Sequence, residues 1–128
     1  MDYETKTTES MHGGKRLTTV VTLGDCPPDF TGEQPGKRVL VLVTSKGCNG
    51  LSSHASVCCD YLRKSERGAY WVRVSAVFKD YSKTIMRAPQ GTRATEKNLR
   101  AIHAEALLLL PEIQAACMAR YYPSTVAA

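Results

Sequence analysis

Ten basic residues of this chain fall in one stretch, between Arg63 and Arg100, where only three acidic residues oppose them. The whole chain has a formal net charge of +5, so this stretch holds its positive excess. Like charges repel, and a fold that concentrates them usually faces an anion. The ten are Arg63, Lys64, Arg67, Arg73, Lys79, Lys83, Arg87, Arg93, Lys97 and Arg100.

Three of these cations sit where a helix is expected to begin. Arg93, Lys97 and Arg100 are four and three residues apart, so they share one side of that helix. The helix dipole disfavours cations in the first turns by roughly 0.3–1 kcal/mol each. Helix N-termini with basic side chains bind phosphate, so the pattern predicts an anion site there.

The sequence therefore predicts a non-enzymatic binding module that docks through a basic surface on nucleic acid or a nucleoprotein. Phosphate contacts would position it, with little base readout. The aromatic ring of Trp71 could stack on a base or on an arginine. The predicted binding residues are Trp71, Arg73, Lys79, Lys83, Arg87, Arg93, Lys97 and Arg100.

An alternative interpretation is a protein-binding inhibitor or adaptor that occludes a larger partner by binding an acidic surface on that partner, as a phage or plasmid counter-defence protein does. This rests on composition, since a small chain with basic loops and no motif suits that role.

A remote third interpretation is a metal or thiol protein. Cys48, His54 and Cys58 carry the donors that zinc prefers. Their spacing is not that of a standard zinc knuckle, and a fourth ligand would have to come from Cys26, Cys117 or His103. We therefore expect no metal and no cofactor.

Catalytic motifs are missing from the sequence. His103-Ala104-Glu105 matches the His-x-Glu of zinc deaminases, but the Pro-Cys-x-x-Cys that completes their metal site does not follow. A cysteine nucleophile would need an adjacent base and an oxyanion site, and no local signature supplies them. The chain is therefore not expected to be an enzyme, and His103 is expected on the edge of a helix.

Length and composition predict one domain. The chain has 128 residues, 43% of them hydrophobic, and five cysteines at irregular spacing that make a poor disulfide framework. The polar start lacks the pattern of a secretory signal, so we expect a cytoplasmic protein. The expected organisation is a disordered leader (1–14), a single α+β domain (15–122) and a tail (123–128).

Strands are predicted at Lys15–Leu23, Arg38–Thr44 and Ala69–Lys79, the first and the last of them from a period-two pattern. The second is apolar on both faces, which suggests cover on both sides and hints at a homodimer. In the third, one face is expected in the core: Tyr70, Val72, Val74, Ala76 and Phe78. The segment from Asp80 to Gly91 is expected to be a loop.

The segment Leu51–Arg63 is ambiguous. Clean alternation favours a strand, which gives an antiparallel sheet of about four strands. As a helix over Ser52–Lys64 it would instead make a βαβ unit in an α/β sheet.

A long C-terminal helix is expected to begin near Thr92 or Thr95 and to pack on one face of the sheet. A kink is expected near Pro111, because proline removes a backbone donor. Leu107, Leu108 and Leu110 widen the apolar face, so burial over more than one side is expected. The core stripe follows at steps of three and four: Leu99, Ile102, Ala106, Leu109, Ile113 and Ala116.

Three antiparallel strands, a loop and a helix with a basic start are similar in outline to a double-stranded-RNA-binding domain. Arg93 to Arg100 would occupy the place of that family's phosphate-contacting lysines. The similarity covers at most the last 65 residues. The chain lacks the family's N-terminal helix and a clear Gly-Pro-His-type loop.

Overall fold

The structure is a computed structural model, which describes residues 3–9, 14–28, 33–47, 50–74 and 80–126. In these residues one sheet carries one long helix and a final helical turn. The elements, in chain order, are β1 (Thr5–Glu9), β2 (Lys15–Asp25), β3 (Gln34–Gly47), β4 (Gly50–Ser65), β5 (Gly68–Val74), β6 (Ser82–Arg87), α1 (Glu96–Tyr121) and α2 (Pro123–Val126).

The sheet is antiparallel and has six strands among the described residues. The strands β1 to β5 follow one another in space as in sequence, and β6 returns to pair with β4. Consequently β5 pairs with the second half of β4, from Cys59 to Ser65, and β6 with its first half, from Ser52 to Ser56. The α+β class is confirmed, and the expected strand count was slightly low.

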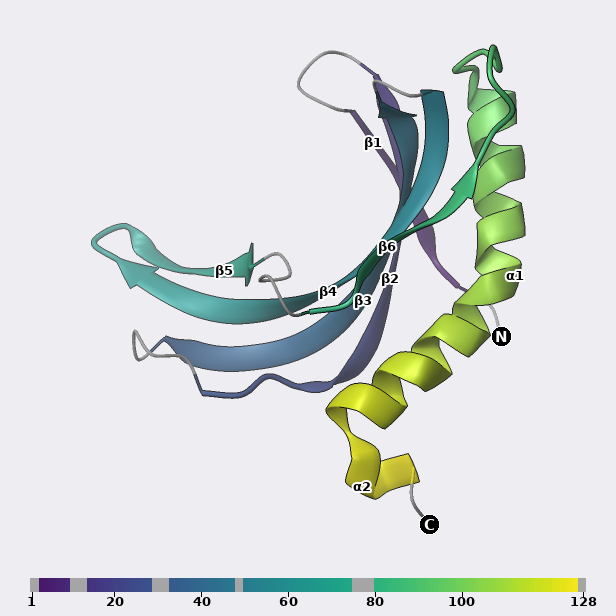
Figure 1. The fold of residues 1–128 in the computed structure, drawn as a ribbon. Coiled ribbons are helices and arrows are strands. Elements are labelled where there is room, and N and C mark those ends of the chain that lie inside the picture. The colour runs from purple at the N-terminus through teal and green to yellow at the C-terminus, as the bar shows by residue number, and fades with distance from the viewer. Residues whose placement is uncertain (1–2, 10–13, 29–32, 48–49, 75–79, 127–128) are drawn as a thin grey trace.

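The sheet is strongly curled, and α1 lies along the outer side of the curl (Figure 1). Leu40 and Leu42 of β3 are fully buried and belong to the cluster that packs on α1. Val39 and Val41 point to the inner side of the curl and are also buried. Apolar residues on both faces of β3 are therefore buried within one chain.

The ambiguous segment is a strand, so the helix alternative for Ser52–Lys64 was wrong. β4 pairs with β3 from the turn at Gly47 and Gly50 back to Gln34. Leu51, Ala55 and Val57 alternate toward α1 and are buried, which a strand achieves and a helix in this place would not.

The helix α1 begins where expected, because the Thr95 hydroxyl caps it by accepting from the Asn98 N–H at 3.2 Å. The helix continues through Pro111 to Tyr121 and curves along the sheet (Figure 1). Its buried residues are Leu99, His103, Ala106, Leu110 and Cys117.

The predicted core stripe of α1 was only partly right. Leu109 and Ala116 are exposed, and Leu110 and Cys117 take their places. Leu108 is 80% exposed, so this helix is not buried on several sides. Because four successive leucines cover every side of the helix, the sequence pattern does not show which of them faces the sheet. Packing against the sheet decides this.

The prediction for His103 was also wrong, because its side chain is only 2% exposed. Its Nε2 shares a hydrogen bond of 2.7 Å with the Thr19 hydroxyl, and its Nδ1 shares one of 2.7 Å with the Thr44 hydroxyl. Thr44 in turn shares a 2.6 Å hydrogen bond with Ser53. A buried polar network thus ties α1 to three strands, since neither threonine is exposed.

Other elements also differ from the expectations. Thr5–Glu9 of the expected leader pair with β2 as strand β1, and Ser82–Arg87 of the expected loop form β6. Tyr70 and Val74, expected in the core, are exposed, because α1 does not extend over β5. Ala76 and Phe78 lie outside the described residues.

Candidate functional site

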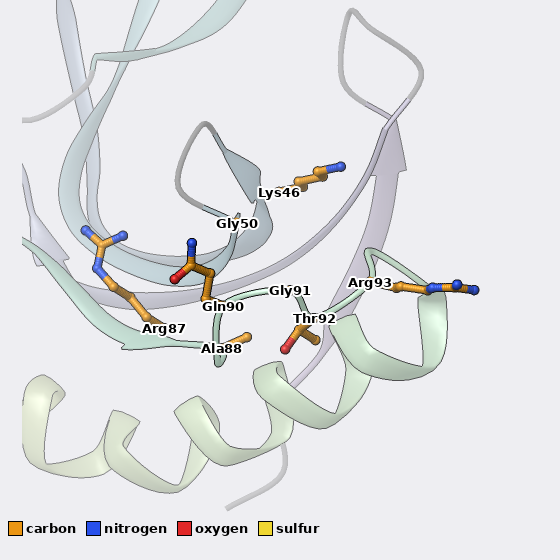
Figure 2. A pocket seen from close by; sticks show the side chains of 8 residues that line it. All are labelled: Lys46, Gly50, Arg87, Ala88, Gln90, Gly91, Thr92 and Arg93. Atoms are coloured by element: carbon orange, nitrogen blue, oxygen red, sulfur yellow. The ribbon is translucent and has the colours of Figure 1, made fainter.

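Several of the cations gather at the end of the sheet where α1 begins. An open hollow of about 830 Å³ lies between the β3–β4 turn and the loop from β6 to α1. Figure 2 shows the side chains of Arg87 and Gln90 directed away from the helix, and those of Lys46 and Arg93 extending to the right of the view, so the cationic groups spread in different directions. The lining residues are Lys46, Gly50, Arg87, Ala88, Gln90, Gly91, Thr92 and Arg93.

The loop that lines this hollow is held at both ends. The Ala88 N–H donates to the Leu51 carbonyl at 2.9 Å, and the Thr92 hydroxyl donates to the Pro89 carbonyl at 2.6 Å. Gly91 has a φ of 90°, which suits glycine in the turn. The Asn98 side chain donates to the Arg93 carbonyl at 2.9 Å. These bonds fix the path of the loop before any ligand arrives.

A second hollow of about 280 Å³ adjoins the first and shares Lys46 with it. Lys15 and Arg16 line it together with uncharged residues. Among the described residues, neither hollow is lined by a carboxylate. We call this surface the basic end, made of Lys15, Arg16, Lys46, Arg87 and Arg93.

The carboxylates near the basic end are few. Glu96 forms ion pairs with Arg100 at 2.9 Å and with Lys15 at 3.5 Å. The hydrogen bond from Arg100, together with Lys15, lowers the pKa of Glu96. Glu9 lies opposite Lys15 in the pairing of β1 with β2. In the described part of the chain, no ion pair engages Lys46, Arg87 or Arg93.

The structure divides the predicted binding residues between distant places. Arg87 and Arg93 line the larger hollow, and Lys97 and Arg100 occupy the first turns of α1 beside it. Lys83, on β6, lies 5.6 Å from the ring centre of Tyr81. Lys79 lies outside the described residues.

Trp71 and Arg73 are on β5, away from the basic end (Figure 1). Arg73 is ion-paired with Asp60 at 2.9 Å. It also borders a hollow of about 390 Å³ that contains both Glu4 and Lys6, so the charge there is mixed. The predicted surface is therefore not continuous in charge from β5 to α1.

The cysteines and histidines that the structure describes do not gather into a metal-binding cluster. His54 and Cys58 share the inner face of β4, and Cys48 lies outside the described residues. The His54 ring shares a 2.8 Å hydrogen bond with Ser82. No cluster of three metal-binding side chains occurs in residues that the structure describes. Burial, aided by Cys59, raises the pKa of Cys26 to about 12, so this thiol keeps its proton at neutral pH.

Sequence reasoning missed Lys15, Arg16 and Lys46. The signal was present in the topology, because an antiparallel hairpin brings its turn to the end of the sheet where the preceding strand began. Lys46 lies at the end of β3, next to the β3–β4 turn, and Lys15 and Arg16 open β2 at that same end.

Comparison with known proteins gives no identity, since no family model, no curated protein and no solved structure matches the chain.

Among the described residues, α1 alone is long and apolar enough to cross a membrane by length and composition. That is weak evidence, since core helices of soluble proteins meet the same criterion.

Proposed function

We propose that this protein is a small non-enzymatic binding module that docks on the phosphate backbone of nucleic acid through its basic end. One observation supports the proposal above others: Lys46, Arg87 and Arg93 surround an open hollow without a carboxylate partner in the described residues. Cations that a protein leaves unpaired around a concave surface favour anionic ligands.

The chemistry of the lining indicates which part of a nucleic acid would be bound. Among the described residues, neither hollow of the basic end is lined by an aromatic side chain, so these residues offer bases no stacking platform. Arginine and lysine contacts to phosphate carry no direct sequence information. We therefore expect sequence-independent binding in which salt competes strongly.

The polar groups of the loop fit the same role. The Gln90 amide and the Thr92 hydroxyl border the hollow between the charged side chains. Neutral donors of this kind commonly supplement arginine and lysine at phosphate oxygens. Because its own hydrogen bonds already fix the loop, little ordering would be needed on binding.

The test is a titration of labelled DNA and RNA duplexes of about 20 base pairs, followed by fluorescence anisotropy from about 50 to 200 mM salt. The double variant Arg87→Gln/Arg93→Gln removes two charges from the basic end. The matched control Lys64→Gln/Arg67→Gln removes two exposed charges at the β4–β5 turn.

We expect the wild-type affinity to fall steeply with salt. The first variant should weaken binding at least tenfold at low salt, and its salt slope should be shallower by about 0.9 for each phosphate that the protein no longer neutralises. The control should bind within about twofold of wild type, a change well under 1 kcal/mol. No binding of either duplex at low salt, or equal losses in both variants, would contradict the proposal.

A further inference from the structure

Two cysteines that are far apart in sequence meet where β2 ends beside β4. The thiol of Cys26, just after β2, lies within hydrogen-bonding reach of the thiol of Cys59 on β4. Both thiols are free. Cys26 is buried and Cys59 is partly exposed, so one of the two sulfur atoms is open to solvent and the other stands behind it.

A bulge in β3 lets Cys26 reach β4. Two residues of β3, Gly36 and Lys37, stand opposite Asp60 of β4 alone. The Cys26 N–H donates to the Gly36 carbonyl at 3.0 Å, and the Asp60 N–H donates to the Cys26 sulfur. The end of β2 is therefore fixed over the bulge by its backbone, with its thiol directed at β4.

The residues on either side of Cys26 are held as well. The Tyr61 hydroxyl of β4 donates to the Pro27 carbonyl at 3.3 Å. The hydroxyl of Tyr122, which follows α1, donates to the Asp25 carbonyl at 2.6 Å. Because the segment is anchored to β4 on one side and to the end of α1 on the other, the two thiols are brought together by the fold itself.

A positively charged side chain adjoins Cys59. Arg38 stands opposite Cys59 in the pairing of β3 with β4, and its guanidinium donates to the Cys59 sulfur. Its other neighbour is the ring of Tyr121, whose centre lies 4.4 Å away. Among the described residues, no carboxylate forms an ion pair with Arg38, and its buried Nε has no hydrogen-bond partner. A guanidinium so placed stabilises the negative charge that a reacting sulfur carries.

We propose that Cys26 and Cys59 form an oxidation site, at which hydrogen peroxide joins β2 to β4 by a disulfide. Cys59 reacts first: its sulfur attacks one peroxide oxygen, the O–O bond breaks, hydroxide leaves and a sulfenic acid forms. The Cys26 sulfur then attacks the Cys59 sulfur, the S–O bond breaks and a second hydroxide leaves. The two hydroxides take up the two thiol protons. The thiols thus lose two electrons and two protons, and the peroxide is reduced to two molecules of water.

The environment of Cys26 explains the order of these steps. Burial, together with the hydrogen bond and the charge of Cys59, raises the pKa of Cys26 to about 12, so Cys26 keeps its proton while Cys59 is reduced. Conversion of Cys59 to a sulfenic acid removes that neighbouring charge. The Asp60 N–H and the Arg38 guanidinium, which both lower the pKa of Cys26, remain in place. Cys26 therefore becomes the better nucleophile only after Cys59 has reacted.

The other described cysteines fit a disulfide less well. Cys58 adjoins Cys59 in sequence, but neighbours in a strand point to opposite faces, and Cys58 packs with Val39 and Val41 on the inner side of the curl. Cys117 on α1 is 1% exposed and belongs to the core cluster beneath the helix. These positions favour the pair of Cys26 and Cys59.

The test exposes the full chain, under native conditions, to a small molar excess of hydrogen peroxide and follows its intact mass. The wild-type chain should lose two hydrogen atoms, about 2 Da, and dithiothreitol should reverse this loss. A non-reducing digest at acidic pH, analysed by mass spectrometry, should place the disulfide between Cys26 and Cys59. This digest needs no variant, so a folding defect cannot imitate the result.

Variants then separate the roles of the two thiols. Cys26→Ser should stop at a sulfenic acid on Cys59, which dimedone traps, whereas Cys59→Ser should give no trapped product at Cys26. Cys58→Ser and Cys117→Ser are the matched controls and should form the disulfide at the wild-type rate. The proposal fails if the wild-type chain forms no disulfide, if the digest shows a different pair, if Cys26 is trapped in Cys59→Ser, or if either control variant loses the disulfide.

Discussion

His103 on α1 and Thr44 on β3 share a buried hydrogen bond of 2.7 Å, although 59 residues separate them in sequence. The other ring nitrogen of His103 engages Thr19 in the same way. Both hydroxyls are uncharged, and no ion pair in the described residues involves this histidine. A protonated imidazole would therefore carry a buried charge without a counterion, and burial lowers the pKa of His103 below its ordinary 6.5.

This burial makes the folding stability depend on pH. Above pH 6.5 the histidine is neutral in both states; below it, the unfolded chain binds a proton that the folded chain resists. The free energy of unfolding should therefore fall as the pH drops below 6.5, by up to about 1.4 kcal/mol per pH unit. Urea denaturation from pH 7.5 down to 5 measures this slope. His103→Gln should flatten it; the same slope in His103→Gln would refute the assignment.

Thr44→Val should destabilise the protein although it keeps the shape of the side chain. The valine leaves the His103 Nδ1 and the Ser53 hydroxyl without a common partner in a buried site. The expected loss is about 1–3 kcal/mol of unfolding free energy, measured by urea denaturation. Thr22→Val, on an exposed position of β2, is the matched control and should change stability little. Equal losses of unfolding free energy in the two variants would mean that the hydrogen-bond network does not stabilise the fold.

Two neighbouring leucines on α1 should respond in opposite ways to truncation. Leu110 is fully buried, so Leu110→Ala should cost about 2–5 kcal/mol of stability. Leu108 is 80% exposed, so Leu108→Ala should stay within about 0.5 kcal/mol of wild type. Thermal and urea denaturation of both variants measure the difference. A large loss of stability in Leu108→Ala would show that the helix packs against the sheet with a different face.

Gly36→Ala should disturb the only tryptophan of the chain. A Cβ atom at Gly36 would lie 2.5 Å from the Trp71 ring and 2.9 Å from the Asp60 carbonyl oxygen. The indole must shift from β3, so its fluorescence should move to longer wavelength, with a stability loss of about 1–3 kcal/mol. Gly47→Ala, where nothing lies within 4 Å, is the control and should leave the spectrum unchanged. An unchanged spectrum in Gly36→Ala would show that Trp71 does not pack there.

The sequence predicted best those elements that have a strong apolar pattern or a clear capping residue of their own. β2 alternates, β3 contains a continuous apolar run, and Thr95 caps α1 as expected. The segment of β6 reads as a loop because its burial is slight and its pairing partner lies about thirty residues upstream. Tyr70 and Val74 mislead because alternation shows that a strand exists but not whether a second layer covers it.

The candidate site was predictable in part. Arg87 and Arg93 were among the expected residues because the charge run contains them, whereas Lys46 lies outside that run and joins them only through the hairpin geometry. Arg73 was grouped with them by sequence proximity, yet it lies on β5, away from the basic end (Figure 1). The sequence shows how many basic residues the surface contains, but the topology of the sheet decides which of them lie next to one another.

The position of α1 after all the strands of the sheet has a consequence for synthesis. The strands β1 to β5 are joined in succession, so each hairpin can form from residues that have just left the ribosome. The leucines of β3 then face solvent until α1, whose Ala106, Leu110 and Cys117 belong to the same cluster, emerges to cover them. During that interval a growing chain exposes the surface most prone to aggregation, and chaperones that bind apolar segments would find it there.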